Sequence, residues 1–434
     1  MQLHRGQLAA LESFIGALEI RRGRLPKIGG NDHLVTFKRQ ILEAPHWRAL
    51  IGQSEFYEIL YGTIFSHLSQ LPEDYAGALA DADGGATLAI LKDRLIDAFE
   101  SLPRSYDLFI PLKSLQAIHQ TEIPISNEIS IVDSENHSIL APLLTPSSPI
   151  ELRGLLSGIF QSPSNAVSRR YLRIRASGFG SDMPNSPAVR DAWSTAKQLA
   201  FVGIASGKLS MKHDWLFRDS SSTVVDPAIL VELWNTQSTK WLNPDLEVLR
   251  FFNSLAITEP ITVLDLSGTT AQSLLNAPER EATTPDEFAR AIRMRMDPAI
   301  AFIHLDTADA APVRAAMEWF IDADSNQNET VAFLQRCIGL EAVLGSTESK
   351  RDVTERLADR YAYLVCTTAS ARDVERKRFV DMYKHRSEIV HGRAMKLSEN
   401  HMRASRDARQ MLLQVTWREM QNLLSDARKA RIES

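Results

Sequence analysis

The chain has 434 residues, of which 44% are hydrophobic and 24% charged, and its net charge is −5. Its length predicts two to three globular domains, and no apolar run reaches the ~20 residues that span a bilayer. Its two cysteines, Cys337 and Cys366, are too few for a four-thiolate zinc site or a disulfide framework, so we expect a cytoplasmic protein with reduced thiols.

The N-terminal part is predicted to mix helices and strands. Over the first ~120 residues, apolar side chains recur at three- to four-residue spacing, as in LAALESFIGALE (residues 8–19), which is typical of helices. Alternating runs over residues 127–133, 171–177 and 260–266 predict half-buried strands. Between them, residues 186–207 predict a helix that begins at Ser186 and Pro187 and ends near Gly203 or Gly207.

The C-terminal part is predicted to be helical throughout. Residues 267–288 read as a linker, and a helix opened by Asp309 follows. Four amphipathic helices come next, and short connections between them favour an antiparallel bundle. They cover residues 328–345, capped by Asn328, then 351–365, then a helix opened by Ser370 with Asp373, and a last helix from about Asn400.

These patterns together predict an α+β fold that is mainly α. Residues 1–305 form an N-terminal mixed region of one or two domains, with the break between residues 120 and 150 if there are two. Residues 306–434 form the C-terminal bundle. Residues 350–434 hold 19 basic and 12 acidic side chains, a net charge of +7, so the rest of the chain carries −12. This split indicates a polyanionic partner for the tail or, equally, ordinary solvated helix faces.

Several catalytic motifs are absent from the sequence. It has no phosphate-binding glycine loop, no dinucleotide fingerprint, no His-Glu-x-x-His and no Gly-x-Ser-x-Gly. The histidines at positions 46, 67, 119, 213 and 304 show no ligand spacing, and we find no metal-ligand cluster near residues 386–391. We therefore expect neither a metal site nor a cofactor.

The stretch YKHRSEIVHG, residues 383–392, places Arg386 five positions before His391 near the end of the third bundle helix. IGLEAVLG (338–345) lies on the first helix of the bundle and LADRYAYLV (357–365) on the second. With these three pieces, the chain from about Asp309 to Ser434 resembles the HEPN superfamily, and most closely its Apea-like branch.

The resemblance implies a metal-independent endoribonuclease that works as a homodimer, with Arg386 and His391 as its catalytic residues. The residue types suit this chemistry. An imidazole can remove the proton from a 2′-OH or protonate the 5′-oxygen that leaves. A guanidinium can stabilise the charge that gathers on the phosphorus, without titrating. Such cleavage leaves 2′,3′-cyclic phosphate ends.

Neighbouring residues receive supporting roles under this resemblance: Ser387, Glu388, Glu341 and Tyr383. Glu341 would orient Arg386 or form a plain interhelix ion pair, and Glu388 would hold the His391 ring. Ser387 would touch phosphate or a partner arginine, and Tyr383 belongs to the core in most helices of this kind. Lys384, His385 and Arg393 would bind RNA phosphates, or remain idle surface charges. Arg393 stands where HEPN proteins paired with nucleotidyltransferase antitoxins have a tyrosine, so regulation by modifying a tyrosine is not expected.

Helix geometry favours a site shared between two chains. Five positions at ~100° each set Arg386 and His391 about 140° apart on an ideal helix. They share a face only if the helix bends or ends, which Gly392 would permit, or if a second chain supplies one of them.

Two functions stay open at the level of sequence. One is an RNA-cleaving effector in antiphage defence or a toxin-like system, with tRNA or another structured RNA as substrate. The other is a non-catalytic HEPN module that dimerises or binds nucleotides or RNA. In the first case residues 1–305 act as a sensor or restraint whose acidic surface shields the basic tail. The sequence leaves open whether an operon-encoded partner takes part.

Overall fold

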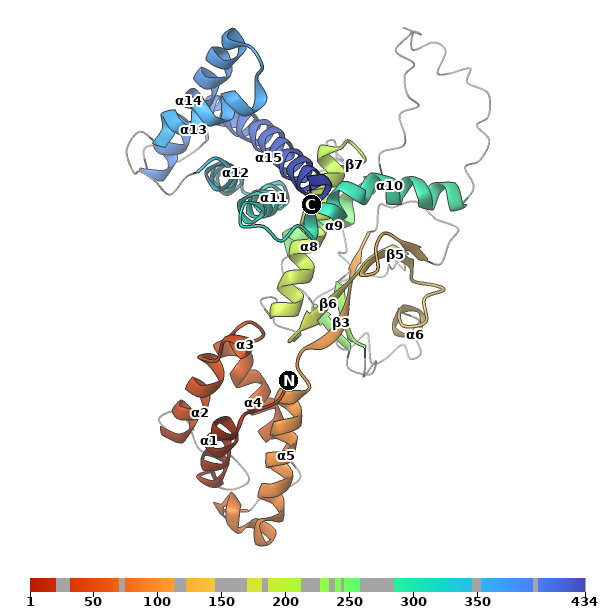
Figure 1. Cartoon of the computed structure of the whole chain (residues 1–434), viewed down its shortest axis with the longest axis vertical. Helices are drawn as coiled ribbons and strands as arrows, with labels where there is room; N and C mark the ends of the chain where they lie inside the picture. Colours follow the sequence, from red (N-terminus) through yellow and green to blue (C-terminus); the bar gives the residue numbers. More distant parts are fainter. Residues whose placement is uncertain are drawn as a thin grey trace. The chain divides into compact units, whose positions relative to one another are not determined.

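The computed structural model describes residues 1–20, 32–69, 75–112, 122–144, 170–181, 186–211, 227–233, 239–242, 246–257, 285–345, 353–392 and 397–433 (Figure 1). The fold is α+β and mainly α, as predicted. The chain divides into two compact units: one comprises Met1–Asp107, Arg175–Asp191 and Leu230–Leu242, and the other comprises Leu108–Ile174, Ala192–Ile229 and Asn243–Ser434. A domain boundary between residues 305 and 306 stays a prediction. In the described part of the chain no helix has the length and apolar character that crossing a membrane requires.

The N-terminal helices form around an aromatic core. Phe37 lies at its centre, with the rings of Phe56 and Phe99 5.5 and 5.7 Å away. The first helix begins with a capping box in which the His4 side chain accepts the N–H groups of Gly6 and Gln7. The predicted helical character of this region is confirmed. Its elements are α1 (Arg5–Gly16), β1 (Glu19–Ile20), α2 (Asp32–Leu42), α3 (Pro45–Arg48), α4 (Gln53–Leu68), β2 (Gly77–Ala78), η1 (Leu79–Gly85) and α5 (Ala86–Glu100).

Six strands form the main sheet, in the order β4-β5-β6-β3-β8-β9. The predicted strands at residues 127–133 and 171–177 are β5 and β6, which pair antiparallel with Ile131 opposite Leu172. The run at residues 260–266 lies outside the described residues. The strands are β3 (Arg104–Pro111), β4 (Glu122–Pro124), β5 (Ile129–Asp133), β6 (Arg170–Gly178), β8 (Ala228–Glu232) and β9 (Thr239–Leu242), and a separate antiparallel pair joins β7 (Leu209–Met211) to β10 (Leu255–Ile257).

The prediction of a half-buried strand is wrong for residues 129–133, because every residue of β5 is buried, whereas residues 127 and 128 are exposed and lie outside the strand. The polar member at its end, Asp133, forms an ion pair with Arg170 of β6, and both side chains are almost fully buried. Pairing with opposite charge lets both groups leave water, so a strand whose sequence alternates polar and apolar residues lies inside the structure.

In the described part of the chain, four further helices precede the C-terminal bundle in sequence, and α8 confirms the helix predicted over residues 186–207. They are α6 (Leu140–Leu144), α8 (Pro187–Ala205), α9 (Leu246–Ser254) and α10 (Pro285–Ile303). The sequence did not predict α10, which begins inside the segment read as a linker. Pro285 stands at its first position, where a missing N–H costs nothing, but Pro298 lies in its interior. The rest of that predicted linker, residues 267–284, lies outside the described residues.

The C-terminal helices are α11 (Ala310–Ser325), α12 (Glu329–Leu344), α13 (Val353–Val365), α14 (Ala369–Val390) and α15 (Glu399–Glu433). The four predicted bundle helices correspond to α12–α15, and α11 packs against α12 and α15. Asn328 caps α12 as predicted, because its side chain accepts the N–H groups of Thr330 and Val331 at 3.0 and 3.3 Å.

One predicted helix start differs from the structure, and another matches in position but lacks the expected side-chain hydrogen bond. Ser370 does not cap α14: the cap is Thr368, whose side chain accepts the N–H of Ala371 at 3.3 Å. Asp309 stands at the cap position of α11, but its side chain accepts no backbone N–H there. The hydroxyls of Thr368 and Ser370, two residues apart, offer the same cap chemistry. The sequence alone therefore does not choose between these neighbouring positions.

Gly339 lies where α12 passes closest to its neighbours. A methyl group on this residue would come within 2.9 Å of Leu412 on α15 and 3.1 Å of the Trp319 β-carbon on α11. Glycine in a helix interior costs about 1 kcal/mol relative to alanine. Tight packing of α12 against side chains of α11 and α15 accounts for the glycine here.

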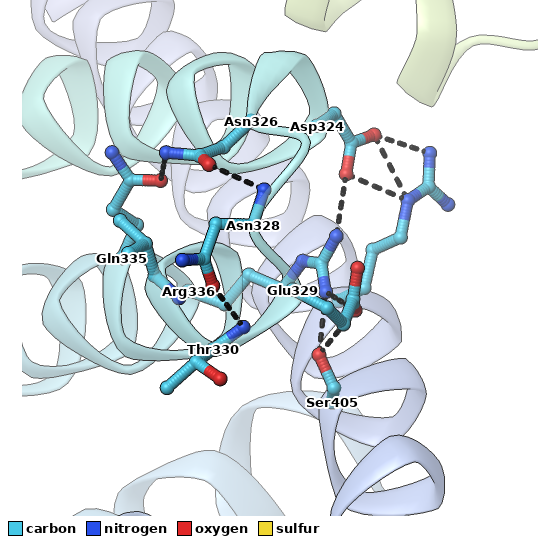
Figure 2. Close-up of polar contacts among 10 residues, drawn as sticks. Asp324, Asn326, Asn328, Glu329, Thr330, Gln335, Arg336 and Ser405 are labelled. Carbon is cyan, nitrogen blue, oxygen red and sulfur yellow. Dashed lines mark hydrogen bonds and ion pairs between the residues drawn. The ribbon is translucent and has the colours of Figure 1, made fainter. Parts of the chain in front are cut away.

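A buried polar network joins α11, α12 and α15 (Figure 2). Arg336 of α12 lies at its centre and donates to Ser405 at 2.6 Å and Glu329 at 2.8 Å, with Asp324 at 3.3 Å. Asp324 also accepts hydrogen bonds from two nitrogens of Arg409, Nε at 2.9 Å and Nη2 at 2.6 Å. The Asp324 side chain is 3% exposed, so this carboxylate depends on its two arginines in place of water.

Replacing Asp324 by asparagine should lower the free energy of unfolding by roughly 3 kcal/mol. Loss of one partner from a buried ion pair costs about 3–5 kcal/mol, and the lower end applies because Glu329 still holds Arg336. Denaturant titration followed by circular dichroism measures the change. The matched control is Asp191→Asn, in an ion pair whose side chains are 63–64% exposed. It should stay within about 0.5 kcal/mol of wild type. Equal effects of the two substitutions would contradict the role given to Asp324.

Candidate functional site

The candidate site lies at the C-terminal end of α14. Phe379, Met382 and Tyr383 of this helix are buried, which fixes the face that it turns to the rest of the bundle. The helix ends at Val390, and His391 occupies the C-cap position. Gly392 follows with φ +67°, a left-handed conformation that favours glycine. The helix therefore stops at the histidine, as the sequence suggested it could.

Arg386 lies in a polar cluster with Glu341 of α12 and Tyr383. Its Nη2 is 3.0 Å from the Glu341 Oε1, and its guanidinium carbon lies 5.4 Å from the centre of the Tyr383 ring. The Tyr383 hydroxyl donates to the same Glu341 oxygen at 2.7 Å. The arginine is thus held by a charge on one side and an aromatic ring on the other. The structure contains the ion pair between Glu341 and Arg386. This contact is expected whether Glu341 orients Arg386 or the two form a plain interhelix ion pair.

The Tyr383 hydroxyl and the Cys337 thiol, which lie near Glu341, stay protonated. Burial raises the pKa of the Tyr383 hydroxyl, and its hydrogen bond to Glu341 raises it further. Burial likewise raises the pKa of the Cys337 thiol, one turn before Glu341 on α12. Neither group supplies a nucleophile or a base at neutral pH. Histidines and carboxylates are the side chains at this end of α14 that suit proton transfer.

His391 is exposed at the helix end. Its backbone N–H donates to the Ser387 carbonyl at 3.1 Å. No side chain in the described ranges makes a hydrogen bond or ion pair with its imidazole. The structure therefore leaves His391 accessible to solvent, while Arg386 points to α12. No hydrogen bond between these two residues is present among the described residues, because α14 ends before His391 while Arg386 pairs with Glu341 of α12.

The role predicted for Glu388 is wrong, because this carboxylate does not hold the His391 ring. It contacts two other histidines instead: Nδ1 of His385 lies 2.9 Å from its Oε2, and Nε2 of His401 lies 3.4 Å from the same atom. The hydrogen bond with His385, ahead of other influences, lowers the pKa of Glu388. On an ideal helix, residues 385 and 388 share a face, whereas the helix ends before residue 391.

The predicted RNA-contacting residues differ in their surroundings. Lys384 is exposed, and Ser387 is half-buried. His385 is half-buried against Glu388, with the His401 ring 4.9 Å away, so it is not the free surface charge that the sequence suggested. Arg393 lies outside the described residues.

The structure also corrects the prediction that no metal-ligand cluster lies near residues 386–391. His385, Glu388 and His401 bring three ligand atoms within 4.8 Å of one another. Part of this cluster is indicated by the sequence, because His385 and Glu388 are three positions apart on one helix. His401 lies on the next helix, so linear spacing could not connect it to the pair.

Comparison of the chain with protein-family models, with curated proteins and with solved structures finds no match.

Replacing Tyr383 by phenylalanine should lower the free energy of unfolding by about 1.5 kcal/mol, the low end for a lost hydrogen bond to a charged group. The low end applies because the Glu341 side chain is one-third exposed, at 33%. Denaturation midpoints of purified variants measure the effect. Tyr363→Phe is the control, since that side chain is mostly exposed, and it should leave stability unchanged within about 0.5 kcal/mol. A Tyr383→Phe protein as stable as the control would show that the hydrogen bond contributes nothing.

Proposed function

We propose that the chain is an endoribonuclease whose cleavage chemistry uses Arg386 and His391 and no metal ion. His391 transfers protons, and Arg386 stabilises the negative charge that develops on the attacked phosphate. The 2′-oxygen bonds to phosphorus as its proton leaves, the bond to the 5′-oxygen breaks, and that oxygen takes up a proton. The products are a 2′,3′-cyclic phosphate and a 5′-hydroxyl, so atoms and charges balance without a further reactant.

The observation that supports this proposal most directly is the contrast between the two residues. Arg386 is held in place by Glu341 at 3.0 Å and by the Tyr383 ring, and positioned charges of this kind stabilise transition states. Its Nε is buried and has no hydrogen-bond partner in the described part of the chain. His391 is exposed at the helix end, where a substrate can reach it. The resemblance of residues 309–434 to Apea-like HEPN domains adds independent support.

The rival function is a non-catalytic HEPN module that dimerises or binds RNA or nucleotides. One observation favours it: the Arg386 guanidinium is already paired with Glu341, and a purely structural ion pair would look the same. The two functions differ in what His391 does. Only the enzyme requires an accessible imidazole at this position.

We propose RNA as the substrate, with tRNA or another structured RNA as candidates, and a homodimer as the active form. Both cysteines are free thiols, which is compatible with the reducing cytoplasm that we propose as the compartment. Residues 1–305 would restrain the nuclease until a trigger acts, as part of a defence or toxin-like system. Their charge of opposite sign to the tail is the basis for that role.

His391→Ala and Arg386→Ala should each reduce RNA cleavage at least about 100-fold, since general acid–base catalysis and charge stabilisation each contribute about 10²–10⁴-fold. His46→Ala and Arg428→Ala are matched controls, because both side chains are exposed and lie outside the cluster. Cells that express each variant would be compared by sequencing RNA ends. The purified proteins would then be tested on an RNA and on its counterpart with 2′-deoxyribose at the cleavage position.

New RNA ends should appear with wild type and both controls only, and the products should carry 2′,3′-cyclic phosphates. The 2′-deoxy substrate should resist cleavage because it lacks the nucleophile. Thermal melts of the same preparations separate lost chemistry from lost folding, which matters for Arg386 because its removal leaves Glu341 with one partner. Full activity of a folded His391→Ala protein would reject the enzyme and favour the non-catalytic module.

Mixing inactive variants should restore activity if each site takes Arg386 from one chain and His391 from the other. Random exchange of Arg386→Ala and His391→Ala chains makes about half of the dimers mixed, and each has one intact site of two, so about a quarter of wild-type activity should return. Light scattering under assay conditions reports the mass. A monomer that still cleaves RNA would exclude the shared site. If the mixed variants form dimers but regain no RNA cleavage, either both residues act within one chain or one site needs Arg386 and His391 from both chains.

A further inference from the structure

We infer that His385, Glu388 and His401 form a binding site for a divalent transition metal, with Zn²⁺ as the best-suited ion. His385 and Glu388 lie one turn apart near the end of α14, and His401 lies in the first turn of α15. Two imidazole nitrogens and one carboxylate oxygen are the donors that zinc prefers in proteins. The inference concerns metal binding only and does not depend on RNA cleavage.

The distances between the donor atoms suit a tetrahedral ion. Bonds of about 2.0–2.1 Å from zinc to nitrogen or oxygen place two donors of a tetrahedron about 3.3 Å apart. The Glu388 Oε2 lies 2.9 Å from the His385 Nδ1 and 3.4 Å from the His401 Nε2. All three donors lie within 4.8 Å of one another. Small side-chain rotations would therefore complete the three-ligand site, with a fourth position open to water.

The His401 side chain provides a second, independent observation. His401 is 92% buried, since only 8% of it is exposed. Its Nε2 is buried and makes no hydrogen bond in the described part of the chain. The Glu388 oxygen at 3.4 Å satisfies the distance for an ion pair, but the geometry of a hydrogen bond is missing. A buried nitrogen without a partner is costly, and a metal ion between the three donors would satisfy it.

Ser398 holds the opposite side of the His401 ring. Its hydroxyl oxygen lies 2.6 Å from Nδ1, and its backbone N–H lies 3.2 Å from the same atom. The backbone N–H donates to Nδ1 in this structure, so metal binding at Nε2 requires Nδ1 to take up the ring proton, turn from that N–H and donate to the Ser398 hydroxyl. Metal-bound histidines in proteins almost always have such an outer hydrogen bond, which fixes the ring and its protonated nitrogen.

An ion can reach this cluster from solvent. His385 lines a groove between α14 and α15, together with Asp381, Met382 and Asn400 among others. The His385 and Glu388 side chains are half-buried and face outward from the buried His401. A bound ion would connect the last turns of α14 to the first turn of α15, and so would fix the helix end that carries His391.

Metal content of the untagged full-length protein tests the inference. Protein stripped of metal with a chelator would be dialysed against Zn²⁺, and its metal content would be measured by elemental mass spectrometry. Co²⁺ would be added in parallel, because its visible absorption reports the number and type of ligands. Wild type should bind one ion per chain. Loss of an outer-shell partner typically weakens metal binding about 10–100-fold. Ser398→Ala should therefore fall in that range, and Glu388→Gln and His385→Ala should lose at least about 100-fold.

Two controls match the ligand variants in chemistry. Glu399→Gln removes an exposed carboxylate two residues before His401, and His46→Ala removes an exposed histidine from α3. Both should bind the ion as wild type does and melt at a higher temperature when Zn²⁺ is added. Circular dichroism confirms folding, and His385→Ala, at the outer edge of the cluster, serves if Glu388→Gln is unstable. Absence of stoichiometric metal from wild type, or equal binding by folded ligand variants, would overturn the inference. Neither result bears on RNA cleavage.

Discussion

The bundle depends on a single buried carboxylate. Asp324 at the end of α11 pairs with Arg336 of α12 and Arg409 of α15, so one negative charge fixes three helices against one another. Charges buried in this way stabilise little in themselves, but loss of either partner is costly, and the arrangement therefore excludes other alignments of the helices. Because α12 also carries Glu341, the same carboxylate indirectly sets the position of the partner that holds Arg386. The geometry of the candidate site therefore depends on the ion pairs of Asp324, which lie outside the site.

Much of the helical architecture could be predicted from sequence, because local rules govern it. Apolar spacing gives the bundle helices, Asn328 marks the start of α12, and Gly392 marks the end of α14. The failures have two causes, one non-local and one local. β5 is buried on both faces because Asp133 meets Arg170, a residue 37 positions later. Helix α10 carries Pro298 in its interior, where proline normally interrupts a helix.

The candidate site shows the same contrast between features that could be predicted from the sequence and features that could not. The contact between Arg386 and Glu341 could be anticipated, since the motif pieces indicated which helices carry them. The partners of Glu388 could not, because His401 comes from the first turn of another helix. Helical spacing described the neighbours of Glu388 as far as α14 continues. It failed at His391, where the backbone ends the helix and no longer follows the 100° rotation per residue.

Gly339 places a limit on how this sequence can diverge. A β-carbon there would lie 2.9 Å from the Leu412 side chain and 3.1 Å from the Trp319 β-carbon, so a neighbour would have to move. Moving α12 outward to relieve the collision would carry Glu341, half a turn further along the helix, away from Arg386. Chains that keep the arginine–glutamate pair should therefore keep glycine at this position, whereas those that lose the pair are free to vary it. Covariation between Gly339, which has no functional group, and the charged pair of Arg386 and Glu341 would then follow from packing alone.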